Sequence, residues 1–156
     1  MLQKRFLLKE CPSLKGLKGE LIMQAFLEVG ENERRVRESD GKYFYTEKQG
    51  TGLERSMQTK QISCSDYLIK MSKRVGDIIT KVRYHIPVKN GFVVKVDVYK
   101  GAHAGLVLAE VDFDDYYALT RFIRPDWIGE DVTKDRRYMN ANLALYGLPK
   151  EDQSEM

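Results

Sequence analysis

Alternation of apolar and polar side chains is the main pattern along this chain, and it predicts a protein built chiefly from β-strands. Successive residues of a strand point to opposite faces, so a period of two marks an extended segment with two different faces. Short apolar runs bounded by glycine are typical of buried strands. Together these patterns predict eight strands, at residues 2–8, 20–28, 33–48 (two strands joined by a turn), 53–62, 78–86, 92–100 and 106–113.

Two dipeptides predict tight turns between neighbouring strands. Asp40-Gly41 lies in the middle of residues 33–48, and Asn90-Gly91 separates the two strands that follow residue 77. Glycine accepts the positive φ that such turns need, and Asn-Gly is a strong short-range hairpin signal. The strands on either side of each turn are therefore expected to run antiparallel.

Helical spacing of apolar residues appears in three places. Ser65 predicts an N-cap with Asp66 in the first turn, and Gly76 predicts the end of that helix. Further helices are expected around residues 114–123 and 134–146. Strands in hairpin succession with two or three flanking helices favour an α+β fold, namely an eight-stranded antiparallel closed β-barrel that forms a tunnel.

Composition narrows the class of protein. A chain of 156 residues is most simply one domain, expected over residues 1–149, followed by a mobile tail at residues 150–156. Cys11 and Cys64 show no disulfide or zinc spacing, and the chain has no signal peptide or long apolar run, so we expect a cytoplasmic protein with no membrane partner. The net charge of +3 is modest. An anion site must therefore come from local clustering, and nucleic acid is not favoured as a partner.

Basic side chains cluster on one face of the predicted strands. If the strands close into a barrel, seven cations point inward together: Arg5, Arg35, Arg37, Lys48, Arg55, Lys81 and Arg83. An eight-stranded barrel is just wide enough inside for side chains or one small ligand. Buried cations need carboxylates, water or an anionic ligand as partners. One charged strand alone is equally compatible with a solvated face, whereas cations on five strands favour an anion site.

Three carboxylates lie on neighbouring predicted strands. Asp97 is followed on the next strand by Glu110 and Asp112, which share one face. Oxygen ligands of this kind suit Mg²⁺ or Mn²⁺, hard ions that leave positions for water and phosphate. The same carboxylates are equally suited to be ion-pair partners of the cations, and the sequence leaves both interpretations open.

On these residues the chain resembles the CYTH family, the triphosphate tunnel metalloenzymes, and in particular its small bacterial single-domain members. The corresponding segments are residues 1–7, Arg35-Val36-Arg37, Lys48, residues 81–84, residues 96–99, Glu110-Val111-Asp112 and residues 129–145. The resemblance implies an eight-stranded antiparallel tunnel that binds a triphosphate end to end. It also implies that Mg²⁺ or Mn²⁺ is held by glutamates, and that the seven cations and Arg136 grip phosphate oxygens, which the arginine fork fits well.

The chain departs from the family pattern on the acidic side of the tunnel. Met1 and Gln3 replace the two glutamates of the opening motif, Met57 and Thr59 replace acids of the central strand, and Lys95 stands where an acid is frequent. A two-metal phosphoryl-transfer site needs oxygen anions to place its ions. We therefore expect at most one weakly bound ion, at the three carboxylates named above, or none.

The sequence leads to one main functional hypothesis and two alternatives. We expect a protein that binds inorganic triphosphate, a nucleoside triphosphate or a related phosphorylated anion in a basic tunnel, with hydrolysis weak or lost. The first alternative is an active metal-dependent triphosphatase of the family, and the second is a scaffold reused as an interaction module. Family members also act on thiamine triphosphate or cyclise ATP, but nothing here selects adenylate cyclisation. The pattern leaves open whether the chain forms a homodimer.

Overall fold

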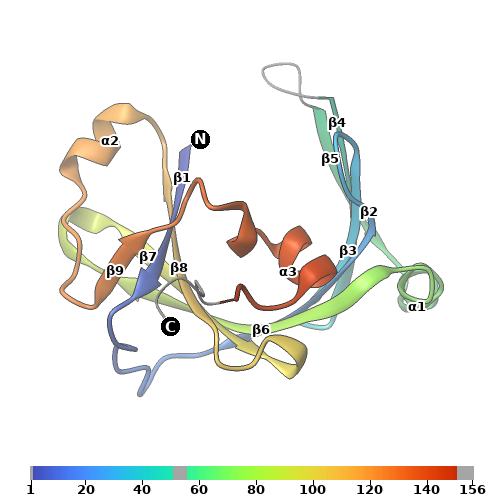
Figure 1. The fold of residues 1–156 in the computed structure, drawn as a ribbon, viewed down its shortest axis with the longest axis horizontal. Coiled ribbons are helices and arrows are strands. Elements are labelled where there is room, and N and C mark those ends of the chain that lie inside the picture. The colour runs from blue at the N-terminus through green and yellow to red at the C-terminus, as the bar shows by residue number, and fades with distance from the viewer. Residues whose placement is uncertain (1, 51–55, 151–156) are drawn as a thin grey trace.

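The computed structural model describes residues 2–50 and 56–150, which form one strongly curved antiparallel sheet with helices on both of its faces (Figure 1). The strands are β1 (Leu2–Leu8), β2 (Glu20–Glu28), β3 (Glu33–Ser39), β4 (Lys42–Gln49), β5 (Ser56–Ile62), β6 (Val75–Pro87), β7 (Val93–Lys100), β8 (Val107–Phe113) and β9 (Ile128–Asp131). The helices are α1 (Cys64–Met71), α2 (Tyr116–Arg121) and α3 (Asn140–Tyr146), with short 3₁₀ turns η2 (Lys89–Gly91), η3 (Gly101–His103) and η4 (Arg136–Tyr138).

The strand order is β5-β4-β3-β2-β6-β7-β8-β1-β9. In Figure 1, β2 to β5 form one arm, β1 and β7 to β9 form the other, and β6 crosses between them. The last helix, α3, lies in the space between the two arms. We call the face of the sheet that carries α3 the concave face.

The prediction of a closed eight-stranded barrel is wrong in both closure and strand number. The sheet has nine strands, and β5 and β9 form its two ends without pairing to each other within the described residues. The ninth strand was not predicted because Ile128–Asp131 is only four residues long and shows no alternation. It pairs with β1 through Phe6 opposite Asp131 and Leu8 opposite Ile128. This pairing occupies the edge of β1 that would otherwise be available for closing the sheet.

The predicted strands themselves are confirmed to within a few residues wherever the structure describes them. Asp40 and Gly41 adopt φ of 51° and 72°, the left-handed conformation that a two-residue hairpin turn requires. Residues 53–55 of the predicted fifth strand lie outside the described residues, as do residues 151–156 of the predicted tail.

The predicted limits of the first helix are wrong at both ends. Its N-cap is Ser63 rather than Ser65, because the Ser63 hydroxyl accepts a hydrogen bond from the Asp66 amide at 3.1 Å. The helix ends at Met71, and Gly76 lies in β6. Gly76 has a φ of +73° and packs against the backbone of α3, so its role is in helix docking and not in capping.

The predicted final helix over residues 134–146 is interrupted. Met139 is extended, with φ of −73° and ψ of 137°, and separates η4 from α3. Two contacts fix α3 to the sheet. The Tyr99 hydroxyl donates to the Asn140 side chain at 2.7 Å, and the buried His103 ring lies 2.6 Å from the Leu143 carbonyl oxygen.

Apolar residues pack on both faces of the sheet. A cluster around Phe6 and Phe113 lies under α2, and a second one around Val36 and Tyr67 lies under α1. A third cluster joins α3 to the concave face through Phe26, Ile79, Tyr99, Leu108, Leu143 and Ala144. The rest of the concave face, beyond this apolar contact with α3, carries polar side chains, and a functional site is therefore expected there. None of the helices in residues 2–50 and 56–150 has the length and apolar character needed to span a membrane.

Candidate functional site

A cavity of about 490 Å³ lies on the concave face, walled on one side by the start of α3. Its lining contains seven basic side chains among the described residues: Arg5, Arg35, Arg37, Lys48, Lys81, Arg83 and Lys95. Strand register explains why they meet. Arg5 is directly opposite Glu110, Lys95 is opposite the same Glu110, and Gln24 is opposite Arg37. Residues opposite one another on neighbouring strands point to the same face, so the cations of both arms share one space.

Six of the cations expected to grip phosphate thus line one cavity, and the other two do not belong to the described lining. Arg55 lies outside the described residues. Arg136 is exposed in η4 and is not part of the cavity lining. Lys95, noted in the sequence only as a departure from the family pattern, is an additional basic residue of the cavity.

Asp97 is the central counter-ion of the site. Its two carboxylate oxygens accept from Arg83 at 2.8 and 2.9 Å, and Lys81 Nζ lies 2.9 Å from one of them. Burial alone would raise the pKa of Asp97, but the hydrogen bonds and charges of Arg83 and Lys81 lower it to about 2. Burial lowers the pKa of Lys81 despite Asp97. Burial would also lower the pKa of Arg83. The hydrogen bonds and the charge of Asp97 outweigh burial there and raise the pKa of Arg83.

Two arginines of the cavity have unused hydrogen-bonding capacity. The Nε of Arg37 is buried and has no hydrogen-bond partner in the described part of the chain, while its Nη2 lies 3.9 Å from Glu20. Burial and the nearby charge of Arg83 lower the pKa of Arg37. The Arg5 side chain makes no ion pair within residues 2–50 and 56–150. A buried donor without a partner is costly, so Arg37 Nε favours an anion in the cavity. The unpaired charge of Arg5 favours an anion there as well.

The three carboxylates predicted as metal ligands are all engaged by basic side chains. Asp97 faces the cations of β6, whereas Asp112 lies 2.8 Å from Lys95 Nζ and accepts from Gln3 at 2.8 Å. Glu110 lies 3.7 Å from both Arg83 and Lys95. No group of three or more His, Cys, Asp or Glu in the described residues could hold a metal ion. Cations stand between the acids, so these residues do not fit a preformed site for Mg²⁺ or Mn²⁺.

The remaining departures from the family pattern also have places in the structure. Gln3 lines the cavity beside Asp112, and Met57 lines it from β5, although its side chain is 62% exposed. The Thr59 hydroxyl is hydrogen-bonded to that of Thr46 at 2.9 Å. Met1 lies outside the described residues.

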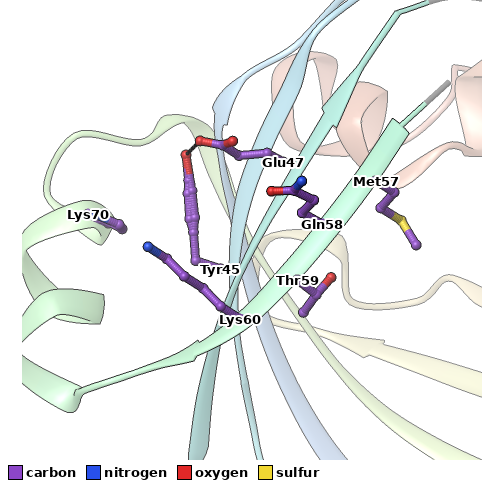
Figure 2. Close-up of a pocket in the computed structure, with 7 residues that line it drawn as sticks. All are labelled: Tyr45, Glu47, Met57, Gln58, Thr59, Lys60 and Lys70. Carbon is purple, nitrogen blue, oxygen red and sulfur yellow. Dashed lines mark hydrogen bonds between the residues drawn. The ribbon is translucent and has the colours of Figure 1, made fainter.

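A second cavity, of about 710 Å³, lies at the edge strand β5 and was not expected from the sequence (Figure 2). Tyr45 lines it and donates a hydrogen bond to Glu47 at 2.7 Å. The ammonium groups of Lys60 and Lys70 lie 5.8 and 5.1 Å from the centre of the Tyr45 ring. The sequence does contain an indication of this second cavity. Alternation along β4 places Tyr45 on the face of the sheet opposite to that of its neighbour Thr46.

Comparison with known proteins places the chain in a family. No family model matches it. The chain is 33% identical over 150 residues to an inorganic triphosphatase of Nitrosomonas europaea, in an alignment that covers 92% of this chain and 96% of that protein. This chain belongs to the triphosphate tunnel family. An inorganic triphosphatase of Acetivibrio thermocellus is 32% identical to this chain over 147 residues. The alignment covers 91% of this chain and 91% of that protein.

A solved structure agrees with this membership. A crystal structure of an inorganic triphosphatase superposes with a TM-score of 0.74 at 31% identity, covering 93% of this chain and 97% of that one. The family resemblance inferred from the sequence is thus confirmed. The interpretation of the missing acids as a loss of catalysis stays a prediction.

Proposed function

We propose that this triphosphate tunnel protein binds inorganic triphosphate in the concave cavity and hydrolyses it to diphosphate and phosphate. The observation that carries the proposal is the lining of the cavity, where seven basic side chains gather with two described carboxylates, Glu33 and Glu110. Asp97, which is not part of the lining, pairs with two of the seven, Lys81 and Arg83. The names of the two curated relatives support hydrolysis in addition to binding. They favour the active alternative over the weak or lost hydrolysis expected from the sequence.

The geometry suits a linear polyanion better than a compact one. Arg35 and Arg37 come from one arm of the sheet, whereas Arg5 and Lys95 come from the other, with Lys81 and Arg83 between them on β6. One extended anion can therefore contact all three groups. Arginine forks bind phosphate oxygens through two parallel hydrogen bonds.

The same cations can lower the barrier to hydrolysis. Attack of a water on a terminal phosphorus breaks one bridging P–O bond, and the leaving diphosphate keeps the electron pair of that bond. Negative charge is redistributed toward the leaving oxygen, and fixed donors that face it stabilise it without reorganising. Lys81 and Arg83 are fixed in this way because Asp97 holds both at 2.8–2.9 Å.

The test compares Arg37→Ala with Arg34→Ala. Arg37 lines the cavity, while its neighbour Arg34 faces the opposite side of β3 and pairs with Glu28. We expect Arg37→Ala to weaken tripolyphosphate binding about tenfold or more by calorimetry and to reduce phosphate release, because a buried donor set is lost. Arg34→Ala should behave like the unmodified chain. Equal effects of both substitutions, or no binding by the unmodified chain, would refute the proposal.

A second candidate function is triphosphate binding without turnover. It is favoured by the carboxylates Asp97, Glu110 and Asp112, which are all engaged by basic residues and form no metal cluster within the described chain. Phosphate release measured with Mg²⁺ or Mn²⁺ present separates the two. Calorimetric binding with no phosphate released supports this second candidate, and turnover above the rate in buffer excludes it.

A further inference from the structure

Lys95 lies between two carboxylates of β8, Glu110, which lines the cavity, and Asp112. It is opposite Glu110 in the pairing of β7 with β8. Its ammonium group is 2.8 Å from Asp112 and 3.7 Å from Glu110, and only 16% of its side chain is exposed. A single ammonium thus bridges two acids that lie two residues apart on one face of a strand.

The neighbouring contacts complete this arrangement. Arg83 approaches Glu110 at 3.7 Å from the other side, and the Gln3 amide donates to the second oxygen of Asp112. Burial would raise the pKa of Asp112, but the hydrogen bonds from Lys95 and Gln3 lower it, so the carboxylate remains charged. The acids of β8 are therefore already neutralised by fixed basic groups.

A divalent ion would meet two obstacles here. Mg²⁺ requires oxygen ligands at short distances in near-octahedral geometry, and the oxygens of Asp112 are taken by donors. A dication placed between Glu110 and Asp112 would also stand within a few ångströms of the Lys95 ammonium, where like charges repel strongly in a partly buried site.

We propose that Lys95 takes the position of a divalent cation between Glu110 and Asp112, so that the cavity binds triphosphate in its metal-free form. The lysine ammonium has three donors. One is directed to Asp112, which leaves others for a phosphate oxygen in the cavity that Lys95 lines. This inference rests on the proposed function in one respect, namely that triphosphate is the ligand.

Calorimetry with sodium tripolyphosphate in excess EDTA, and again in excess Mg²⁺, tests the inference on the unmodified chain. We expect binding in EDTA that is at least as tight as in excess Mg²⁺, because no ion is needed to complete the site and Mg²⁺ withdraws free triphosphate into its own complex. Binding seen only with Mg²⁺ would overturn the role of Lys95 and leave the proposed function intact. No binding in either solution would overturn both.

Substitution of Lys95 gives a second, independent test. Lys95→Met should weaken binding in EDTA about tenfold or more and make it dependent on Mg²⁺, since Asp112 then loses its cation and Glu110 keeps only Arg83, at 3.7 Å. Lys95→Arg keeps the charge and should retain binding in EDTA. Mn²⁺ binding without triphosphate, followed by electron paramagnetic resonance, should be stronger in Lys95→Met than in the unmodified chain.

A matched control is available on the same strand. Lys100 is an exposed lysine at the end of β7, and its position in the alternation puts it on the face opposite to Lys95. Lys100→Met should leave metal-free binding unchanged. If Lys95→Met binds tripolyphosphate in EDTA as tightly as Lys100→Met does, Lys95 does not act as the cation of the site.

Discussion

At the scale of single residues, the site depends on a few counter-ions buried among many cations. Asp97 is 2% exposed and pairs with both Lys81 and Arg83, neither of which could be buried alone at low cost, while Glu110 supplies a second negative charge 3.7 Å from Arg83. The excess of positive charge is then left on residues such as Arg5 and Arg37, which have free donors for a ligand. Lys81 and Arg83 thus belong to the stabilising ion pairs, whereas Arg5 and Arg37 have donors available for a ligand.

Asp97→Asn should cost about 3–5 kcal/mol of unfolding free energy, because it removes the charged partner of buried Lys81 and the nearest charged partner of Arg83. Urea unfolding followed by circular dichroism measures this. Asp77→Asn is the matched control, since Asp77 is exposed on the same sheet, and we expect it to change stability by less than about 0.5 kcal/mol. Similar values for the two variants would contradict the structural role of Asp97.

At the scale of elements, the docking of α3 on β6 defines one wall of the cavity. Gly76 permits it in two ways. Its φ of +73° suits glycine, and a Cβ at this position would overlap the carbonyl oxygen of Ala144 and lie 2.7 Å from its carbonyl carbon. Tyr99 and His103 hold the same helix through Asn140 and the Leu143 carbonyl.

Gly76→Ala should therefore destabilise the protein more than the backbone conformation alone explains. Gly91 has a similar φ of +78° but nothing within 4 Å of a built Cβ, so Gly91→Ala reports the conformational cost by itself. We expect about 1 kcal/mol for Gly91→Ala and at least about 1 kcal/mol more for Gly76→Ala. Thermal and urea unfolding provide the comparison, and equal losses would show that α3 moves aside without cost.

At the scale of the whole molecule, ion pairs make the fold sensitive to acid. The pKa values of four aspartates are lowered in the folded state: Asp97, Asp112, Asp131 and Asp135. A carboxyl whose pKa falls on folding contributes stability that is complete above its unfolded pKa, near 4, and disappears as the pH drops through the folded value. The loss for Asp97 is expected between about pH 4 and pH 2, because its folded pKa is about 2.

This dependence can be assigned to Asp97 by comparing the unmodified chain with Asp97→Asn across pH. The difference in unfolding free energy should be constant from pH 5 to pH 7 and should shrink by about 2 kcal/mol as the pH falls toward 2, since the titrating group is absent from the variant. A difference that stays constant down to pH 2 would mean that Asp97 titrates alike in the folded and unfolded states.

Local alternation allowed much of the site to be predicted from the sequence. Arg35 and Arg37 share a face because they are two residues apart on a strand, and the same holds for Lys81 and Arg83. The Asp40-Gly41 turn fixes the register of its hairpin in the same local way. Capping was less predictable, because Ser63, Ser65 and Asp66 offer competing N-caps and only the packed helix selects Ser63.

The sequence by itself therefore determined eight of the nine described strands, the hairpin pairing of consecutive strands and the basic face, because each depends on residues close together in the chain. The pairings of β2 with β6 and of β1 with β8 join distant segments and were left to the tertiary structure. Only the tertiary structure decided that β9 pairs with β1 and leaves the sheet open, and that Lys95 stands between Glu110 and Asp112. These features depend on hydrogen bonds and ion pairs between distant segments. Periodicity shows which face a side chain occupies, whereas register and packing decide which partner it meets there.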